Sequence, residues 1–191
     1  MLFRAPLALL PLLGLTATAS PITFFRRDAE AEPTGCSDVS FKAMSWVARN
    51  FDFHASYTFT TPAHQNSWGY ASFELFNPAT QSTTHCEASS GQLNDFFYGT
   101  VAYKCNDSRT TFDYSRPSNQ LHINQTWVCT DRDPQYPITF SGSGEANLTL
   151  ECTDTTWENP AWEMGQIYSS RTVQCKPTDS KITPTELTAI A

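Results

Sequence analysis

The chain has 191 residues with 12 basic and 19 acidic side chains, and its formal net charge at pH 7 is −7. A protein with this excess of negative charge is repelled by phosphate backbones and anionic lipids. We therefore expect neither nucleic acid nor a membrane surface as a partner. Between the two tails described below lie about 140 residues, the size of one domain.

The first 19 residues have the features of a secretory signal peptide. Arg4 precedes an apolar run from Leu7 to Leu15, and Ala17-Thr18-Ala19 fits the small-x-small cleavage pattern. The run is shorter than the roughly 20 residues of a membrane span. Residues 20–35 are a candidate propeptide or linker, because secretory-pathway proteases often cut after a pair such as Arg26-Arg27. Cleavage there would leave 9 basic and 19 acidic residues, a net charge of −10. We expect a secreted, extracellular protein.

Segments with alternating apolar and polar residues begin at residue 51. Within residues 51–60, Phe51, Phe53, Tyr57 and Phe59 share one face, which is the pattern of a half-buried strand. Further strands are expected in residues 68–78, 82–91, 98–107, 121–129, 137–152 and 165–175, with a break at Gly142 and Gly144. No stretch of ten or more residues shows helical periodicity. Residues 36–176 therefore predict an all-β domain, a single compact antiparallel β-barrel or β-sandwich cross-linked by disulfides.

The C-terminal residues differ from this pattern. Residues 177–191 are polar, contain Pro177 and Pro184, and show no periodicity. We expect them to form a disordered tail.

Six cysteines behind a signal peptide indicate an oxidising compartment and structural disulfides. No two of them have the short C-x-x-C spacing of a zinc or redox site. Cys86 and Cys105, and likewise Cys129 and Cys152, fall on the apolar faces of expected strands, so we predict these two pairs. Cys36 and Cys175 remain. A bond between them would join the two ends of the domain, but the sequence leaves their connectivity open.

Three Asn-x-Ser/Thr sequons, at Asn106, Asn124 and Asn147, are candidate N-glycosylation sites. Asn124 and Asn147 lie on the outward faces of expected strands, and Asn106 lies in a turn. All three positions are compatible with a glycan on a folded domain.

The sequence contains no short motif of a known catalytic centre: G-x-S-x-G, H-E-x-x-H, a phosphate loop and a dinucleotide fingerprint are all absent. His54, His85 and His122 have outward parity on different strands and His64 lies in a turn, so we expect solvated histidines. Two carboxylates across a cleft would serve glycoside hydrolysis. The acidic candidates are Glu74, Glu87, Asp95, Asp113, Asp131, Asp133, Glu145 and Glu151. The sequence places no two of them face to face, and we expect no catalytic residue, no metal, no cofactor and no enzymatic activity.

Asp131-Arg132-Asp133-Pro134 has two interpretations. Two carboxylates around a guanidinium fit an acid/base centre, but Asp before Pro also starts a turn, because its side chain bonds nearby amides and proline restricts φ. We favour a turn between two strands.

The tryptophans divide into two groups. Trp46, Trp68 and Trp127 are expected in strands, where core packing is the usual role. Trp157 and Trp162 lie in a connection that contains proline and glycine. There, exposed rings would stack on sugars or anchor a protein partner. Packing over the mouth of a barrel is the other interpretation, and the one we favour.

The segments SFELFNPATQSTTHCEASS, DFFYGTVAYKC and LHINQTWVCTDRDPQYPITFSGSGEANLTLEC resemble the fungal secreted family named for the major allergen of Alternaria. The resemblance covers residues 40–176, and its most specific elements are the ordered cysteine pairs with an aromatic-x-Cys ending at Cys105. It implies a compact β-barrel without a recognised catalytic site and with two intrachain disulfides, which would correspond to Cys86–Cys105 and Cys129–Cys152. In the founding allergen an N-terminal cysteine joins two subunits, whereas Cys175 here offers Cys36 an internal partner. We therefore expect a monomer or a non-covalent dimer.

The leading interpretation is a secreted non-enzymatic β-barrel protein, allergen-like or an effector at the interface with a host, that acts by binding a host protein or glycan. The alternative is a carbohydrate-binding module or a small glycan-active enzyme, based on Trp157, Trp162 and the acidic residues. A carrier of small molecules would require an internal cavity. Bulky side chains would fill that space if they point inward, as expected for Phe53, Phe59, Tyr103 and Leu148.

Overall fold

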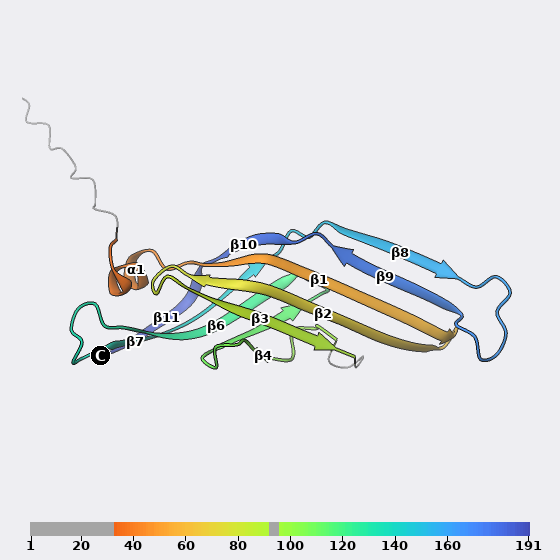
Figure 1. The fold of residues 1–191 in the computed structure, drawn as a ribbon, viewed down its shortest axis with the longest axis horizontal. Helices are drawn as coiled ribbons and strands as arrows, with labels where there is room; N and C mark the ends of the chain where they lie inside the picture. The colour runs from red at the N-terminus through yellow and green to blue at the C-terminus, as the bar shows by residue number, and fades with distance from the viewer. Residues whose placement is uncertain (1–32, 92–95) are drawn as a thin grey trace, which may run out of the picture. The chain divides into compact units, whose positions relative to one another are not determined.

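The computed structural model describes residues 33–91 and 96–191, all of them in the compact unit Pro33–Ala191. The expected signal peptide, the propeptide up to residue 32, and Asp95 lie outside the described residues. Among the residues described, no helix is both long and apolar enough to cross a membrane. The elements (Figure 1) are the helix α1 Cys36–Lys42 and the strands β1 Trp46–Thr61, β2 His64–Asn77, β3 Ser82–Ser90, β4 Tyr103–Lys104, β5 Thr110–Ser115, β6 Gln120–Cys129, β7 Ile138–Asn147, β8 Cys152–Glu158, β9 Ser169–Cys175, β10 Thr178–Ile182 and β11 Pro184–Ile190.

The strands form two antiparallel sheets. The first sheet has the order β3-β2-β1-β9-β8, with β10 also paired to β1, and the second has the order β11-β7-β6-β5-β4. The all-β prediction is therefore confirmed. Of its two architectures, the sandwich describes these strands better than the barrel, because the described strands form two separate sheets.

Aromatic side chains fill the space between the sheets. β1, β2 and β6 bury alternate residues, as the period of two requires. Rings from the two sheets then meet: Trp46 and Trp127 at 6.0 Å between centroids, Phe51 and Tyr114 at 5.0 Å, and Phe73 and Phe112 at 5.0 Å. Such edge-on and tilted contacts stabilise aromatic pairs beyond their buried area.

One buried amide connects four strands across this core. Gln125 Oε1 of β6 accepts hydrogen bonds from Trp46 Nε1 at 2.7 Å and from Asn77 Nδ2 at 2.8 Å, while Gln125 Nε2 donates to Thr110 Oγ1 at 3.0 Å. Asn77 Oδ1 in turn accepts the backbone N–H of Ala79 at 2.9 Å, which shapes the turn after β2. The polar atoms of Gln125 are therefore satisfied within the core, which removes the cost of burying them.

All six cysteines form disulfides within the chain. Cys86–Cys105 matches the predicted pair and joins β3 of the first sheet to the segment after β4 of the second. The predicted Cys129–Cys152 bond is wrong: Cys129 pairs with Cys36, and Cys152 pairs with Cys175. Face parity did not identify these partners for two reasons. Cys36 lies on a short helix, where strand parity does not apply. Cys152 begins β8, a strand that was not predicted, and lies directly opposite Cys175 of β9.

Several strand boundaries differ from the expected ones. Within residues 98–107 only Tyr103–Lys104 is a strand, while β5 and β8 were not anticipated. β7 runs without a break through Gly142 and Gly144. At these positions the absence of a side chain lets neighbouring groups lie close to the strand. A Cβ at Gly142 would lie 2.9 Å from the Trp46 ring, and one at Gly144 would lie 2.7 Å from the backbone oxygen of Thr183.

The C-terminal residues are part of the fold, which corrects the expected disordered tail at 177–191. β10 pairs with β1 in the first sheet, and β11 pairs with β7 in the second, so this segment passes from one sheet to the other. Ile182 pairs with Trp46 and is 0% exposed in the core, whereas Ile190 is 70% exposed. The segment lacks clear periodicity because outward side chains dominate it and Ile182 is the main apolar anchor.

Replacing Ile182 by alanine should therefore lower the free energy of unfolding by about 2–5 kcal/mol, the usual cost of truncating a fully buried aliphatic side chain. Ile190→Ala, in the same segment, is the matched control and should change it by less than about 0.5 kcal/mol. Urea unfolding followed by tryptophan fluorescence measures both values. Equal and negligible effects would show that the C-terminal strands do not contribute to the core.

Candidate binding surface

The pairing register places side chains from four adjacent strands on the outer face of the first sheet. Trp68, Ser56, Thr172 and Thr155 are paired in succession across β2, β1, β9 and β8, so their side chains share that face. Trp157 follows Thr155 by two residues and has the same orientation. We call this surface the tryptophan face and define it as His54, Ser56, Trp68, Tyr70, Thr155, Trp157, Thr172 and Gln174.

Two indole rings are half exposed on the tryptophan face. Trp68 and Trp157 are each 51% exposed, and the strand spacing separates their strands by roughly 14 Å. The side chains between them are hydroxyls. An indole ring surrounded by such groups offers apolar contact area with hydrogen-bonding partners close by, which suits recognition of another molecule. The expectation of core packing is therefore correct for Trp46 and Trp127 and wrong for Trp68.

Trp157 and Trp162, the two sequence candidates, differ in their availability. Trp162 is half-buried, its Nε1 donates to the backbone oxygen of Gln166 at 3.0 Å, and its ring meets Tyr168 edge-on at 5.8 Å. These contacts hold Trp162 within its own loop between β8 and β9. Trp157 belongs to β8, a strand exposed along its whole length, and its side chain is half exposed, so the favoured packing over a barrel mouth is wrong for Trp157.

A polar group borders Trp68 on the same face. The rings of His54 and Tyr70 stack at 4.9 Å, and the Tyr70 hydroxyl donates to Asp52 Oδ2 at 3.2 Å. Burial and the neighbouring Asp52 carboxylate raise the pKa of Tyr70, so its hydroxyl stays protonated and remains a donor. Beside it, Tyr70, Glu87 and Ser89 line an open depression of about 280 Å³.

Three histidines contact carboxylates and are only partly exposed, whereas the sequence predicted solvated surface side chains. His54 Nε2 lies 2.8 Å from Asp52 Oδ1, His85 Nδ1 lies 2.8 Å from Glu74 Oε1, and His122 Nδ1 lies 2.9 Å from Asp113 Oδ2. The hydrogen bond with Glu74 raises the pKa of His85. The outward parity of these histidines was predicted correctly, but each pairing depends on the register between strands or on local side-chain geometry. His122 of β6 lies directly opposite Asp113 of β5. This alignment of the two strands was not predicted from the sequence.

Of the other acidic candidates, Glu87 meets Glu74 at His85, and the remaining ones are dispersed. Glu87 lies 3.4 Å from the far nitrogen of His85, Glu151 pairs with Lys176 at 2.8 Å, and Glu145 is exposed on β7. Asp133 Oδ1 accepts the backbone N–H of Gln135 at 2.8 Å, as in a turn. These contacts are typical of surface ion pairs and turns.

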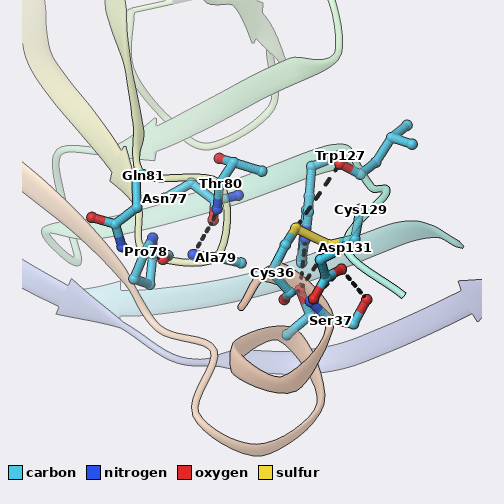
Figure 2. The surroundings of a disulfide bond; sticks show 12 residues. Cys36, Ser37, Asn77, Pro78, Ala79, Thr80, Gln81, Trp127, Cys129 and Asp131 are labelled. Atoms are coloured by element: carbon cyan, nitrogen blue, oxygen red, sulfur yellow. Dashed lines mark hydrogen bonds between the residues drawn. A yellow bond between two sulfur atoms is a disulfide. The ribbon is translucent and has the colours of Figure 1, made fainter. Parts of the chain in front are cut away.

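The Asp131-Arg132-Asp133 segment lies between β6 and β7, as predicted, but it also holds α1 in place. Figure 2 shows Asp131 beside Ser37 at the start of this helix. Asp131 accepts hydrogen bonds from Ser37 Oγ at 2.6 Å and from Ser37 N at 3.1 Å, and Arg132 pairs with Asp38 at 2.6 Å. Asp131 thus serves as the N-cap side chain that Gly35 lacks. Gly35 has φ of +86°, and a Cβ there would lie 2.7 Å from Asp131 Oδ2, so glycine satisfies both the conformation and the close approach.

Cys36, Cys129 and Asp131 are the group of potential metal ligands found among the described residues, with ligand atoms within 4.8 Å of one another. The two sulfur atoms are bonded to each other and offer no thiolate. The carboxylate is occupied by Ser37. The chemistry of this group fits a structural cross-link, not a metal site.

The three sequons lie at different depths. Asn106 follows Cys105 and is exposed, Asn147 is exposed at the end of β7, and Asn124 is half-buried on the outer face of β6. Glycosylation at these positions stays a prediction.

A family model described as Alternaria alternata allergen 1 matches residues 48–175. The chain belongs to this family. The match to the allergen 1 family extends from within β1 to the last residue of β9 and confirms the resemblance noted in the sequence. α1, with Cys36, and the strands β10 and β11 lie outside the matched residues. Searches of curated proteins and of solved structures return no match.

The hydrogen bonds from Ser37 lower the pKa of Asp131 below its ordinary value of 3.8. The stabilisation of α1 by this carboxylate is therefore present above pH 3.8 and is lost as the pH falls through the lower folded value. NMR titration of the Asp131 carboxyl should show a depressed midpoint, and Ser37→Ala should move that midpoint upward. An identical midpoint in the two proteins would show that Ser37 does not set the ionisation of Asp131.

Proposed function

We propose that this allergen 1 family protein is secreted and acts by binding a host protein through the tryptophan face, as an effector-like or allergen-like protein. The role depends on surface recognition and requires no turnover. The exposure of Trp68 and Trp157 on one sheet face is the observation that carries the proposal.

Secretion is supported by two independent features. The first 19 residues have the composition of a signal peptide, and all six cysteines are paired, as is common in oxidising compartments. The intact mass of the secreted protein, before and after deglycosylation, would locate the mature N-terminus and count the glycans.

A protein partner agrees with the chemistry of the surface. Tryptophan is enriched among residues that dominate protein interfaces, and a face built from four adjacent strands permits contact over a wide area. The acidic character of the chain favours a basic partner surface.

The test is capture of a saturable partner from host extracts by the immobilised native protein. Trp68→Ala and Trp157→Ala should each weaken binding by about 30-fold, since hot-spot residues contribute at least about 2 kcal/mol. Tyr136→Ala removes an exposed aromatic ring in the loop between β6 and β7, away from the tryptophan face, and should leave affinity unchanged.

Two outcomes would contradict the proposal in different ways. The absence of a saturable partner across host extracts would contradict a protein-binding role. Binding that is insensitive to both tryptophan variants would contradict the assignment of the surface.

A glycan ligand is the second candidate, favoured by the hydroxyl side chains between Trp68 and Trp157. Sugar rings stack on indole faces while neighbouring hydroxyls bond their oxygens. Glycan-array binding that Trp157→Ala abolishes and Trp162→Ala leaves largely intact would support it, because the Trp162 ring is engaged within its own loop. No bound glycan, or equal loss in both variants, would count against it.

A further inference from the structure

The outer face of the second sheet, remote from the tryptophan face, brings three residues into one hydrogen-bonded series. Asp113 of β5 and His122 of β6 are direct partners in the register, and Ser143 of β7 is a diagonal neighbour of His122. Asp113 Oδ2 lies 2.9 Å from His122 Nδ1, and His122 Nε2 lies 2.9 Å from Ser143 Oγ. The three residues come from three strands and are separated in sequence by 9 and 21 positions.

These contacts determine the protonation pattern of the neutral imidazole. An ionised Asp113 only accepts hydrogen bonds, so Nδ1 carries the proton of His122. Nε2 is then the unprotonated nitrogen and accepts the hydrogen bond of the Ser143 hydroxyl. Nucleophile, base and orienting carboxylate are thus in the order and at the distances that activate a serine hydroxyl.

The series is accessible without being fully solvated. The side chains of His122 and Asp113 are 31% and 24% exposed. Ser143 lines an open hollow of about 400 Å³, which Arg109 and Asn124 also line. A small substrate would therefore reach Ser143 from solvent.

The same hollow contains a donor for a developing oxyanion. Asn124 is the direct register partner of Ser143, so the two side chains start roughly 5 Å apart on one face. The Asn124 amide donates hydrogen bonds. Arg109 and Glu186 also line the hollow and carry opposite charges, and the Arg109 guanidinium lies 3.8 Å from Asp107, so Asn124 is the donor that the proposal uses. Backbone N–H groups of these strands are used in the sheet, so side chains must serve this purpose.

We propose that Ser143 is a nucleophile activated by His122 and oriented through Asp113, and that it takes the acyl group of small esters. Ser143 Oγ attacks the carbonyl carbon while His122 Nε2 takes the hydroxyl proton. The bond to the alcohol oxygen breaks, and the alcohol leaves with the proton from Nε2. Water then attacks the acyl-serine, its proton passes through Nε2 to Ser143 Oγ, and the acid is released.

This chemistry goes beyond the binding function proposed above and uses a different face of the domain. It also modifies the expectation that the protein has no catalytic residue. A glycan on Asn124 would occupy the amide nitrogen of the proposed donor, so the test requires protein without N-glycans. Production in the bacterial periplasm provides such protein and allows the disulfides to form.

The experiment uses a fluorophosphonate probe, which transfers its phosphonyl group to an activated serine and releases fluoride. Peptide mass spectrometry should locate the label on Ser143. Labelling should disappear in Ser143→Ala and slow by about a hundredfold in His122→Gln, the lower part of the range for a positioned base. Hydrolysis of p-nitrophenyl acetate should fall in the same variants.

Ser141→Ala is the matched control. Ser141 is on the same face of β7 but bonds to Thr126 Oγ1 at 3.0 Å instead of a histidine, so its loss should leave labelling unchanged. Far-ultraviolet circular dichroism and the absence of free thiols would verify that each variant is folded. The proposal is overturned if folded native protein carries no label on Ser143, or if His122→Gln labels at the native rate.

Discussion

The fold depends on how one buried amide is satisfied between two sheets. Gln125 accepts from Trp46 and Asn77 and donates to Thr110, so three strands lose a hydrogen bond if β6 shifts by one residue. An unpaired amide inside an aromatic core would cost several kcal/mol, which makes incorrect registers expensive. Aromatic packing alone tolerates variation in position. The Gln125 contacts therefore select one alignment of the sheets.

That alignment determines which surfaces the protein presents. With the aromatic side chains directed between the sheets, each sheet has an outer face of mainly polar residues. On the first sheet this face carries Trp68 and Trp157, exposed among hydroxyls. On the second it carries the series from Asp113 to Ser143. Both surfaces consist of cross-strand neighbours, so their geometry is as rigid as the sheet that supports them, and neither requires a loop to close over it.

The cross-links and the C-terminal strands attach the outer parts of the domain to this core. Cys36–Cys129 and the Asp131–Ser37 hydrogen bonds hold α1 against the end of β6, and β10 places Ile182 beside Trp46 in the core. Cys152–Cys175 joins β8 to β9 where both faces of β8 are exposed. Arg171 has the parity of the inward-facing residues of β9. It is nevertheless exposed and pairs with Asp154, because the neighbouring strand β8 is exposed on both faces.

By themselves, composition and period-two patterning determined the all-β class and the inward direction of Phe51, Phe53, Leu121 and Ile123, because strand parity is a local property. The same reasoning paired Cys86 with Cys105 correctly and Cys129 with Cys152 wrongly, so parity alone does not determine a disulfide. Tertiary structure decided what depends on distant neighbours. The partners of Cys36 and Cys152, the role of Asp131 at α1, the exposure of Trp68 and the meeting of Asp113, His122 and Ser143 each require a register or a sheet order. Parity states which way a side chain points. Only the pairing of strands states what it meets there.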